Sequence, residues 1–546
     1  MSNVRLELVW PNKEKFLLSP QDEDGKPVWV DRSHPAAREV RLTEFTHASG
    51  EVNDQRPEGD NLLFIGDSLD ALRILNETPA FRREYRGKVK LIYIDPPFNT
   101  GQAFEHYDDW MEHSTWLSFM RDRLLLMKEL LAPDGSIWVH LDDAEVHRMR
   151  ALMDEVFGAN NFVATVIWER TDSAAMQAKI SYNHDNILVF QKTPSFTPNG
   201  FDDYESNTAF SKVDADGRKY YTHTLRMSGP GSQREDRPTM WYPMVAPDGS
   251  EVFPIRQNGT EGRWRWGPEK YEREKANIVW RQTKEGGWEP SRRIYQDASQ
   301  PKPPLTIWPY SEVGSNRHGK LEVSALFPGL SPFSTPKPEK LLQKIVHVAT
   351  NTGDIVLDLF GGSGTTAATA HKMRRRWVTS EIQASTVERF IQPRIKKVID
   401  GSDLGGVTQS SGWSGGGGFR TLEIQETFYA LTPLGVMLVD DASGPRFARA
   451  VAGQLGFDWE MTTGTLTGRR GRMRLSVFDN AVGIEEARQV VSELEDNERV
   501  TIVARVILPG TEEWLAENSR GSICLKAPND VLRERRRRRR KNGGDE

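Results

Sequence analysis

The sequence predicts an α/β protein whose main domain is a Rossmann-like, doubly wound sheet of mostly parallel strands. Short apolar runs alternate with amphipathic helical patterns in residues 51–162 and again in residues 331–400, as in parallel sheets covered by helices. Residues 163–330 are rich in Trp, Arg, Pro and Gly and show no sustained helical period. We therefore expect one sheet domain, formed by both stretches, that an inserted module interrupts.

The first stretch contains three expected strands with helices between them. LLFI leads into Gly-Asp-Ser, where Asp67 or Ser68 can cap a helix that places Leu69, Leu72 and Leu75 on one face. The strand LIYI ends in DPPF, the run TWLSFMRDRLLLMKELL has helical spacing, and SIWVHL is a further buried strand. Strands separated by such helices favour parallel pairing, with helices on both faces.

The second stretch resumes the same pattern. PEKLLQKIVHVAT predicts a helix, DIVLDLFGGSGTT predicts a strand with a glycine-rich turn, and RRWVTSEI predicts a strand that ends at Glu381. The rest of the chain divides into an N-terminal extension at 1–50, a Gly/Ser-rich linker at 401–420, a small C-terminal α/β domain at 421–527 and an Arg-rich tail at 528–546.

Composition limits the class of protein and its location. The chain has 546 residues, which predicts several domains, and 37% hydrophobic and 27% charged residues, which is typical of a globular protein. The single cysteine, Cys524, excludes an intramolecular disulfide, and no signal peptide or run of about 18 apolar residues is present. We expect a cytoplasmic protein. The net charge of −5 does not exclude nucleic acid, because an acidic body can carry a basic face.

The glycine turn after DLF predicts a cofactor site. Gly361, Gly362 and Gly364 let a ligand approach the backbone at a helix N-terminus. A triphosphate-binding loop needs a lysine before its Ser or Thr, but Thr365 follows Gly364 directly, so no ATP site is expected. Glu381 ends the next strand, at the distance where an acidic side chain accepts ribose hydroxyls. This favours an adenosyl cofactor over a simple tight turn.

The motif DPPF predicts the reaction chemistry. Pro96 and Pro97 fix the backbone and hold the Pro96 carbonyl beside the Asp95 carboxylate. Two fixed acceptors suit an exocyclic amine on a flat base, because they stabilise its nitrogen as it becomes positive during attack on an activated methyl group. Phe98 can stack on the base. The alternative is a solvated aspartate at a loop stop.

These motifs together resemble a known family. IYIDPPFNTG, TPKPEKLL and DLFGGSGTT, in this order, resemble the β-class amino-methyltransferases of DNA, in which the catalytic motif precedes the cofactor motif. GDSLDAL, GSIWVHLDDAEVHRMRALMDEVFG and SGWSGGGGF are similar to the modification (Mod) subunits of type III restriction-modification systems. The resemblance covers roughly residues 60–430. It implies a circularly ordered methyltransferase domain that uses S-adenosylmethionine and acts on the N6 amine of adenine in duplex DNA.

The resemblance also implies roles for the matching residues. The catalytic motif is formed by Asp95, Pro96, Pro97 and Phe98. The methionine part of the cofactor is held by Asp358, Phe360, Gly361, Gly362 and Gly364, and its ribose by Glu381. Lys337 and Glu339 are expected to complete the methionine end, and Asp67 to lie near the cofactor adenine.

Two positions depart from the family pattern. Phe98 stands where tyrosine is commoner, which leaves the N4 amine of cytosine as an alternative target. Gly362 stands where alanine is frequent, a change that we expect to be harmless.

The inserted module is the expected DNA-recognition element, because a target base must be flipped out of the duplex while the DNA is held. Its candidate DNA contacts are Arg234, Arg237, Arg263, Arg265, Arg281, Arg292 and Arg293, which lie close to several tryptophans in the sequence. For any single residue, the alternative is a small domain with a tryptophan core and surface arginines. The Arg-rich tail is expected either to contact phosphates nonspecifically or to be inert.

The leading hypothesis is therefore a site-specific DNA amino-methyltransferase that acts as the modification and recognition subunit of a type III-like system. A second hypothesis is a chain that serves chiefly as the DNA-recognition subunit for a separate helicase-nuclease. The resemblance also implies a homodimer. His140, Asp142, Asp143 and His147 in WVHLDDAEVH resemble metal ligands, but amine methylation needs no metal and none is expected.

Overall fold

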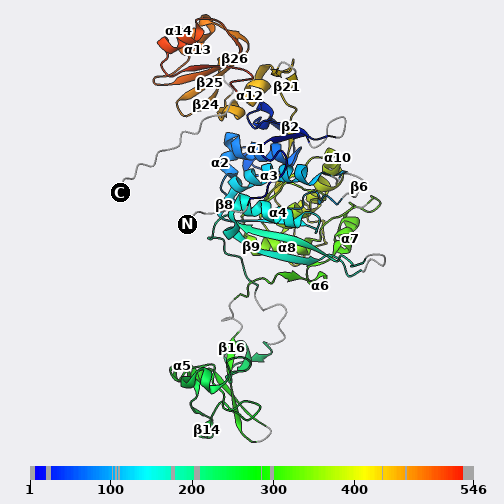
Figure 1. The fold of residues 1–546 in the computed structure, drawn as a ribbon, viewed down its shortest axis with the longest axis vertical. Coiled ribbons are helices and arrows are strands. Elements are labelled where there is room, and N and C mark those ends of the chain that lie inside the picture. The colour runs from blue at the N-terminus through cyan, green and yellow to red at the C-terminus, as the bar shows by residue number, and fades with distance from the viewer. Residues whose placement is uncertain are drawn as a thin grey trace. The chain divides into compact units, whose positions relative to one another are not determined.

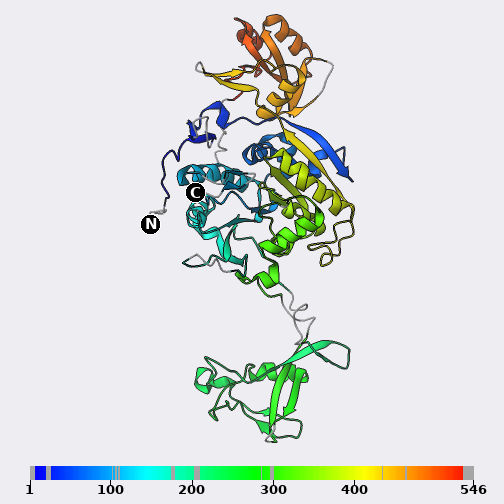
Figure 2. The same cartoon turned by 90° about the vertical axis from the view of Figure 1, so that its right-hand side faces the viewer.

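The computed structural model describes residues 7–19, 26–100, 103–104, 107–108, 111–173, 179–201, 210–283, 286–295, 301–331, 333–432, 435–460 and 464–532. The chain divides into two compact units (Figures 1 and 2). The first consists of Met1–Pro198 and Leu305–Glu546, and the second of Asn199–Pro304. The predicted Arg-rich segment from residue 533 onward lies outside the described residues.

The first unit is built on a ten-stranded sheet. In spatial order its strands are β17 (Ile307–Trp308), β9 (Phe162–Glu169), β10 (His184–Gln191), β8 (Leu131–Leu141), β5 (Val89–Ile94), β18 (Ile355–Asp358), β19 (Arg376–Glu381), β4 (Asn61–Ile65), β20 (Gly418–Ile424) and β3 (Thr43–Gly50). All neighbours from β8 to β20 are parallel. The predicted α/β fold class is confirmed.

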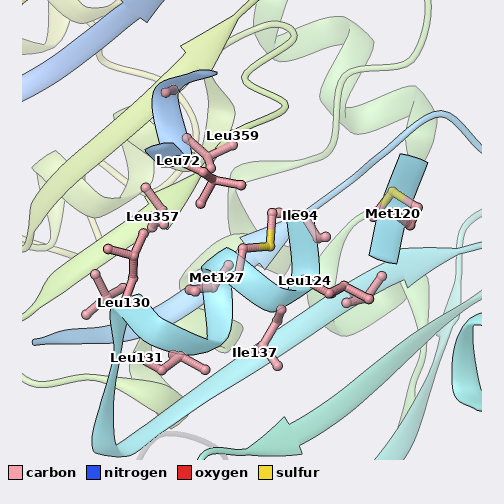
Figure 3. Close-up of a cluster of buried hydrophobic side chains, with 14 of the residues drawn as sticks. Leu72, Ile94, Met120, Leu124, Met127, Leu130, Leu131, Ile137, Leu357 and Leu359 are labelled. Atoms are coloured by element: carbon pink, nitrogen blue, oxygen red, sulfur yellow. The ribbon is translucent and has the colours of Figure 1, made fainter. Parts of the chain in front are cut away.

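Helices cover both faces of this sheet. They are α1 (Ser68–Glu77), α2 (Pro79–Tyr85), α3 (His113–Leu130), α4 (Val146–Met153), α8 (Glu339–Ala349), α9 (Thr365–Lys372) and α11 (Gln392–Ile399). One core joins α1, α3 and α4 to alternate strand residues such as Ile92 and Ile94 (Figure 3). Leu91 of β5 and Val356 of β18 are equally buried but do not belong to that core. Helices α8 and α9 contact these two strands. Because successive residues of a strand point to opposite faces, the sheet has buried side chains on both faces.

Strand pairing brings the two stretches of the sequence together. Val356 and Leu357 of β18 pair with Leu91 and Ile92 of β5. Parallel neighbours end at the same edge of a sheet, so the DPPF motif after β5 and the glycine turn after β18 emerge side by side.

The inserted module differs from its predicted limits of 163–330. β9 and β10 form an antiparallel pair that extends the large sheet beside β8. The second unit is therefore narrower, and it contains the strands β11 (Lys212–Val213), β12 (Lys219–Thr224), β13 (Met244–Val245), β14 (Glu251–Val252), β15 (Ile278–Gln282) and β16 (Trp288–Tyr295) and the helix α5 (Pro268–Glu274). Trp264 and Trp266 are buried in its core.

Both predicted flanking segments contribute to the large sheet. β3, from the extension at 1–50, pairs antiparallel with β20, which begins inside the predicted linker at 401–420. The last part of the linker lies close to a neighbouring segment of backbone. A Cβ on Gly418 would lie 2.3 Å from the carbonyl oxygen of Glu51. The glycines in this segment therefore allow a close backbone approach.

The predicted C-terminal α/β domain contains a five-stranded sheet. Its strands are β23 (Asp458–Trp459), β24 (Leu466–Arg470), β25 (Met473–Val482), β26 (Arg499–Ile507) and β27 (Ile523–Lys526), with helices α12 (Gly444–Leu455), α13 (Ile484–Ser492) and α14 (Thr511–Asn518). Shorter elements of the first unit are β1 (Phe16–Ser19), β2 (Val28–Val30), β6 (Ala103–Phe104), β7 (Tyr107–Asp108), α6 (Tyr310–Val313), α7 (Asn316–Leu326), α10 (Ala384–Thr386), β21 (Tyr429–Thr432) and β22 (Gly435–Leu438). Among the described residues, no helix is long and apolar enough to span a membrane.

Candidate active site

A cavity of about 750 Å³ opens at the carboxyl ends of the parallel strands. Its wall is formed by residues that follow four neighbouring strands: Asp67 after β4, Asp95 after β5, Phe360 after β18 and Glu381 at the end of β19. A pocket of this size and position is typical of ligand sites in open α/β sheets. The structure therefore places the DPPF motif and the glycine turn in one cavity.

The two oxygens of the Asp95 carboxylate lie in different environments. Its Oδ2 accepts a hydrogen bond of 2.6 Å from Lys337 Nζ. Its Oδ1 is buried and has no hydrogen-bond partner among the residues that the structure describes. The motif itself is held firmly, because Trp116 Nε1 donates to the Pro97 carbonyl at 2.8 Å. A fixed, unpartnered acceptor in a cavity wall fits a ligand that brings an N–H donor.

The residue after the motif anchors the loop that follows it. Asn99 has a left-handed φ of 61°, and its Nδ2 donates to Glu145 Oε1 at 2.7 Å. Its Oδ1 accepts from the Met111 amide at 2.6 Å. Glu145 is fully buried and also contacts His113 Nδ1 at 2.5 Å. Asn99 and Glu145 were not predicted as site residues, because their pairing joins separate elements.

The glycine turn brings backbone close to the end of β19. The Gly361 amide donates to the Ser380 carbonyl at 2.8 Å, and a Cβ on Gly361 would lie 2.8 Å from Thr379 Oγ1. Gly362 and Gly364 have φ of +50° and +76°, which favour glycine. Gly364 is also the N-cap of α9. The local geometry thus explains the glycines at these three positions.

Two acidic side chains border this turn. Glu381 Oε2 accepts from the Gly362 amide at 3.0 Å, so the expected ribose acceptor is tied to the glycine turn. Asp358 is buried at the end of β18, and its Oδ1 accepts from the Phe360 amide at 3.0 Å. Burial, helped by the charges of Asp95 and Glu381, raises the pKa of Asp358 to about 7. A cationic group bound nearby would favour its charged form.

Asp67 lies in the cavity wall but is already engaged. It caps α1 by accepting from the Leu69 amide at 2.7 Å, and its two oxygens accept from Arg123 Nη2 at 3.0 and 2.8 Å. Arg123 is nearly buried and also donates from Nε to Ser68 Oγ at 2.7 Å. Arg123 therefore fixes the wall at this end of the cavity, and its role was not predicted from the sequence.

Lys337 and Glu339 have different environments, although they lie two positions apart in the sequence. Lys337 lies in the cavity wall, over the Phe98 ring at 5.2 Å. Glu339 is not in that wall. Its carboxylate is buried against Lys372 Nζ at 2.8 Å and Arg394 Nη2 at 2.9 Å. Burial opposes its charge, but Arg394 and Lys372 hold the pKa of Glu339 below its usual value.

The cofactor role expected for Glu339 therefore requires correction. Arg394 Nη1 donates to the Ser363 carbonyl at 3.2 Å and to Thr365 Oγ1 at 2.9 Å. Glu339 therefore orients Arg394, and Arg394 donates hydrogen bonds to the turn that contains Gly364. The Glu339 side chain contacts the glycine turn through Arg394 and not through the cavity, because helix α8 directs it into the protein interior.

A large part of the chain matches a known protein family. Residues 89–392, more than half of the chain, match the model of a family described as DNA methylase. The chain belongs to this DNA methylase family. The match begins at β5 and ends in α11, so it includes the catalytic motif, the inserted module and the glycine turn.

Curated relatives of this chain are named as type III restriction-modification Mod subunits or as type II methyltransferases. The "Probable type III restriction-modification enzyme HindVI Mod subunit" of Haemophilus influenzae is 30% identical over 72% of this chain and 59% of its own length. The StyLTI Mod subunit of Salmonella typhimurium is 31% identical over 56% of this chain and 49% of its own length. The type II methyltransferase M.KpnI of Klebsiella pneumoniae is 29% identical over 56% and 76%. The chain thus spans about half to three-fifths of the two Mod subunits.

The arginines predicted to contact DNA all lie in the second unit of the methylase, in unlike environments. Arg234 pairs with Glu261 at 2.7 Å and Arg281 with Glu289 at 2.6 Å. Arg263 Nε donates to the Gly231 carbonyl at 2.5 Å. Arg237 follows a short 3₁₀ helix as its C-cap. The side chains of Arg234, Arg263 and Arg281 are therefore partly committed to contacts within the unit, whereas Arg237 is exposed.

Arg265 and Arg292 lie close to His223, whereas Arg293 lies on the other face of the sheet, over the Tyr220 ring. The Nε atoms of these three arginines are buried and have no hydrogen-bond partner among the described residues. Burial, together with the positive charges of Arg265 and Arg292, lowers the pKa of His223, which pairs with Arg292 across β12 and β16. Positive charge therefore gathers on this sheet. The DNA-binding role of these residues stays a prediction.

The histidine and acidic residues of WVHLDDAEVH do not gather into a metal site. His140 bonds to Tyr93 and Asp185, and Asp143 accepts from Asn186 Nδ2 at 2.9 Å. His147 is exposed on α4. Within the described part of the chain, no group of three or more His, Cys, Asp or Glu side chains is placed to hold a metal ion.

Proposed function

We propose that this chain is an S-adenosylmethionine-dependent DNA methyltransferase that methylates the exocyclic N6 of adenine at a specific sequence. The observation that carries this proposal is the Asp95 carboxylate, whose unpartnered Oδ1 shares a cavity with the glycine turn. An amine acceptor and an adenosyl-type site at one sheet edge are what direct methyl transfer to an amine requires.

The residues around the turn fit this cofactor. Glu381 would accept from the ribose hydroxyls, while the backbone at Gly361 and Gly362 allows close approach of the methionine part. Asp358, with its raised pKa of about 7, would face the positively charged groups. When bound, S-adenosylmethionine supplies a methyl group on a positively charged sulfur. Lys337 is the nearby cation suited to the methionine carboxylate.

The catalytic motif would activate the target amine. Asp95 Oδ1 and the Pro96 carbonyl accept hydrogen bonds from the two N–H groups of N6, which draws the nitrogen lone pair toward the methyl group. N6 would form a bond to the methyl carbon as the bond between that carbon and sulfur breaks and S-adenosylhomocysteine leaves, and the Asp95 carboxylate would accept the proton that N6 then loses. Phe98 would stack on the flipped base.

We further propose that the chain is the modification and recognition subunit of a type III-like system. Its relatives include proteins named as type III Mod subunits, and the second unit carries the arginine group around His223. In this arrangement the second unit reads duplex DNA, and a separate helicase-nuclease chain is the restriction partner. A homodimer would supply two copies of the recognition unit.

Single-molecule sequencing of plasmid DNA from cells that express the wild type or Asp95→Ala tests the reaction. We expect N6-methyladenine at one short motif with the wild type and none with the variant. Methylation at N4 of cytosine would instead identify cytosine as the target base. Full methylation by Asp95→Ala would refute the catalytic role of Asp95. Co-purification of a helicase-nuclease chain from the native cell tests the partner.

A further inference from the structure

The ring of a buried histidine stacks on the Phe98 ring of the catalytic motif. His140 lies in β8 and is 0% exposed. Its ring lies 5.9 Å from that of Phe98, with 23° between their planes. Trp168 packs edge-on against the same imidazole, 5.4 Å from His140 at 87°. The plane of the imidazole therefore sets the plane available to the Phe98 ring.

Hydrogen bonds from both neighbouring strands fix this imidazole. Tyr93 Oη, from β5, lies 2.9 Å from Nδ1. Asp185 Oδ2, from β10, lies 3.1 Å from Nε2. β8 lies between β5 and β10 in the sheet, so the ring is held at both nitrogens and from both sides. An aromatic side chain without these bonds could fill the same space but would not be oriented in this way.

The charges of the two partners determine the direction of these bonds. Burial, together with the carboxylates of Asp95, Asp358 and Asp185, raises the pKa of Tyr93 well above its usual value, so its hydroxyl keeps the proton. Burial opposes the charge of Asp185, but His140, Lys337 and Arg170 lower its pKa overall. Tyr93 therefore donates to Nδ1, and Nε2–H donates to Asp185. Both ring nitrogens of His140 are thus engaged by side chains of the neighbouring strands.

We propose that His140 is a positioning residue that holds the Phe98 ring in the plane required for stacking on the flipped target base. This inference rests on the proposed methyltransferase function. Asp185 also connects His140 to the cavity wall. Its Oδ1 lies 3.3 Å from Arg170 Nε, and both Asp185 and Arg170 line the cavity. The imidazole that stacks on Phe98 is thus linked through Asp185 to Arg170 in the cavity wall.

His140→Phe and Tyr93→Phe test this role, with His147→Phe as the control. His140→Phe keeps an aromatic ring but removes both hydrogen bonds, and Tyr93→Phe removes a single hydroxyl. His147 is exposed on α4. The measurements are the single-turnover rate of methyl transfer from labelled S-adenosylmethionine to unmethylated plasmid DNA, the affinity for S-adenosylhomocysteine by calorimetry, and the melting temperature.

We expect His140→Phe to slow transfer about tenfold or more at saturating DNA and cofactor, because small misplacements of a reacting group have effects of this size. Tyr93→Phe should slow it in the same direction, and His147→Phe should not. Cofactor affinity should stay within about twofold of wild type, since His140 contacts the base-stacking ring and not the glycine turn. A merely structural role would instead lower cofactor affinity and melting temperature together.

The two hypotheses fail in different ways. If the wild type transfers methyl groups and both ring variants transfer them within about twofold of its rate, the inference is overturned and the proposed function stands. If the wild type itself transfers none to DNA, the proposed function fails and the inference fails with it. If His140→Phe does not fold, Tyr93→Phe decides the question, because it removes only one oxygen atom.

Discussion

Lys337 Nζ lies 2.6 Å from Asp95 Oδ2 and joins two motifs that are 242 residues apart in the chain. The ion pair is sheltered, because Lys337 is 8% exposed and Asp95 is 23% exposed. It holds one oxygen of the catalytic carboxylate and leaves the other open. Lys337 therefore connects the proposed methionine end of the cavity to the amine acceptor.

Substitution of these two residues should separate cofactor binding from methyl transfer. We expect Lys337→Met to weaken binding of S-adenosylmethionine about tenfold or more, because it removes a nearly buried cation suited to the methionine carboxylate. Asp95→Asn should abolish transfer while cofactor binding is retained. Isothermal titration calorimetry with S-adenosylhomocysteine measures both affinities. Equal affinities for Lys337→Met and the wild type would exclude a cofactor role for Lys337.

Glu339→Gln should destabilise the protein strongly. The substitution leaves Lys372 and Arg394, both 0% exposed, without their shared carboxylate. Removing one partner of a buried ion pair costs about 3–5 kcal/mol. Denaturant unfolding measures this loss, and Glu312→Gln, at a side chain that is 53% exposed, is the control expected to change stability little. A loss below about 1 kcal/mol would contradict the proposed anchoring role.

Asp358 should make stability depend on pH in the neutral range. Its folded pKa of about 7 lies above the usual 3.8, so between these values the folded protein holds a proton that the unfolded chain has released. Stability from this group is therefore present at low pH and is lost as pH rises through about 7, with a slope of up to about 1 kcal/mol per pH unit. Asp358→Asn should remove this slope.

Unfolding free energies of the wild type and Asp358→Asn between pH 5 and pH 8 provide the measurement. The difference between the two proteins isolates Asp358 from other groups, including Glu322, whose pKa burial also raises to about 7. Parallel curves for the two proteins would show that Asp358 does not titrate in this window.

Two glycines of the turn, Gly361 and Gly362, should tolerate alanine differently. Gly361→Ala places a Cβ 2.8 Å from Thr379 Oγ1 and 3.1 Å from the Ser380 carbonyl, so the end of β19 must move and cofactor affinity should fall. In Gly362→Ala the nearest atom to the added Cβ belongs to the Phe333 ring, at 3.4 Å, so the variant should cost about 1 kcal/mol for the left-handed backbone. Calorimetric affinity and melting temperature compare the variants. A larger loss of affinity in Gly362→Ala would argue against this geometry.

Arg292→Ala should weaken DNA binding in a salt-dependent way. Arg292 lies beside Arg265 and His223 in the second unit, and removal of one phosphate-binding side chain should lower the salt slope of log K by about 1. Binding of duplex DNA at several salt concentrations measures the slope. Arg273→Ala is the control, because Arg273 is 69% exposed and pairs with Glu274. An unchanged slope in Arg292→Ala would remove this residue from the DNA interface.

Much of the fold could be predicted because local patterns encode it. The alternation of apolar strands with amphipathic helices indicated β4, β5, β8, β18 and β19 and the helices after them, and these elements form the parallel centre of the sheet. The edges were harder to predict. β9 and β10 form an antiparallel pair that extends the sheet beside β8, and β3 pairs antiparallel with the distant β20. No local signal separates such strands from the flanking segments in which they lie.

The sequence by itself determined the motifs, their order and the strands that carry them, because local apolar patterns and turn residues specify these elements. Only the tertiary structure decided what each side chain faces. It turned Glu339 inward to Arg394, joined Lys337 to Asp95, and placed His140 behind Phe98. Spacing specifies the element that carries a residue, whereas partners from distant segments are selected when the elements pack.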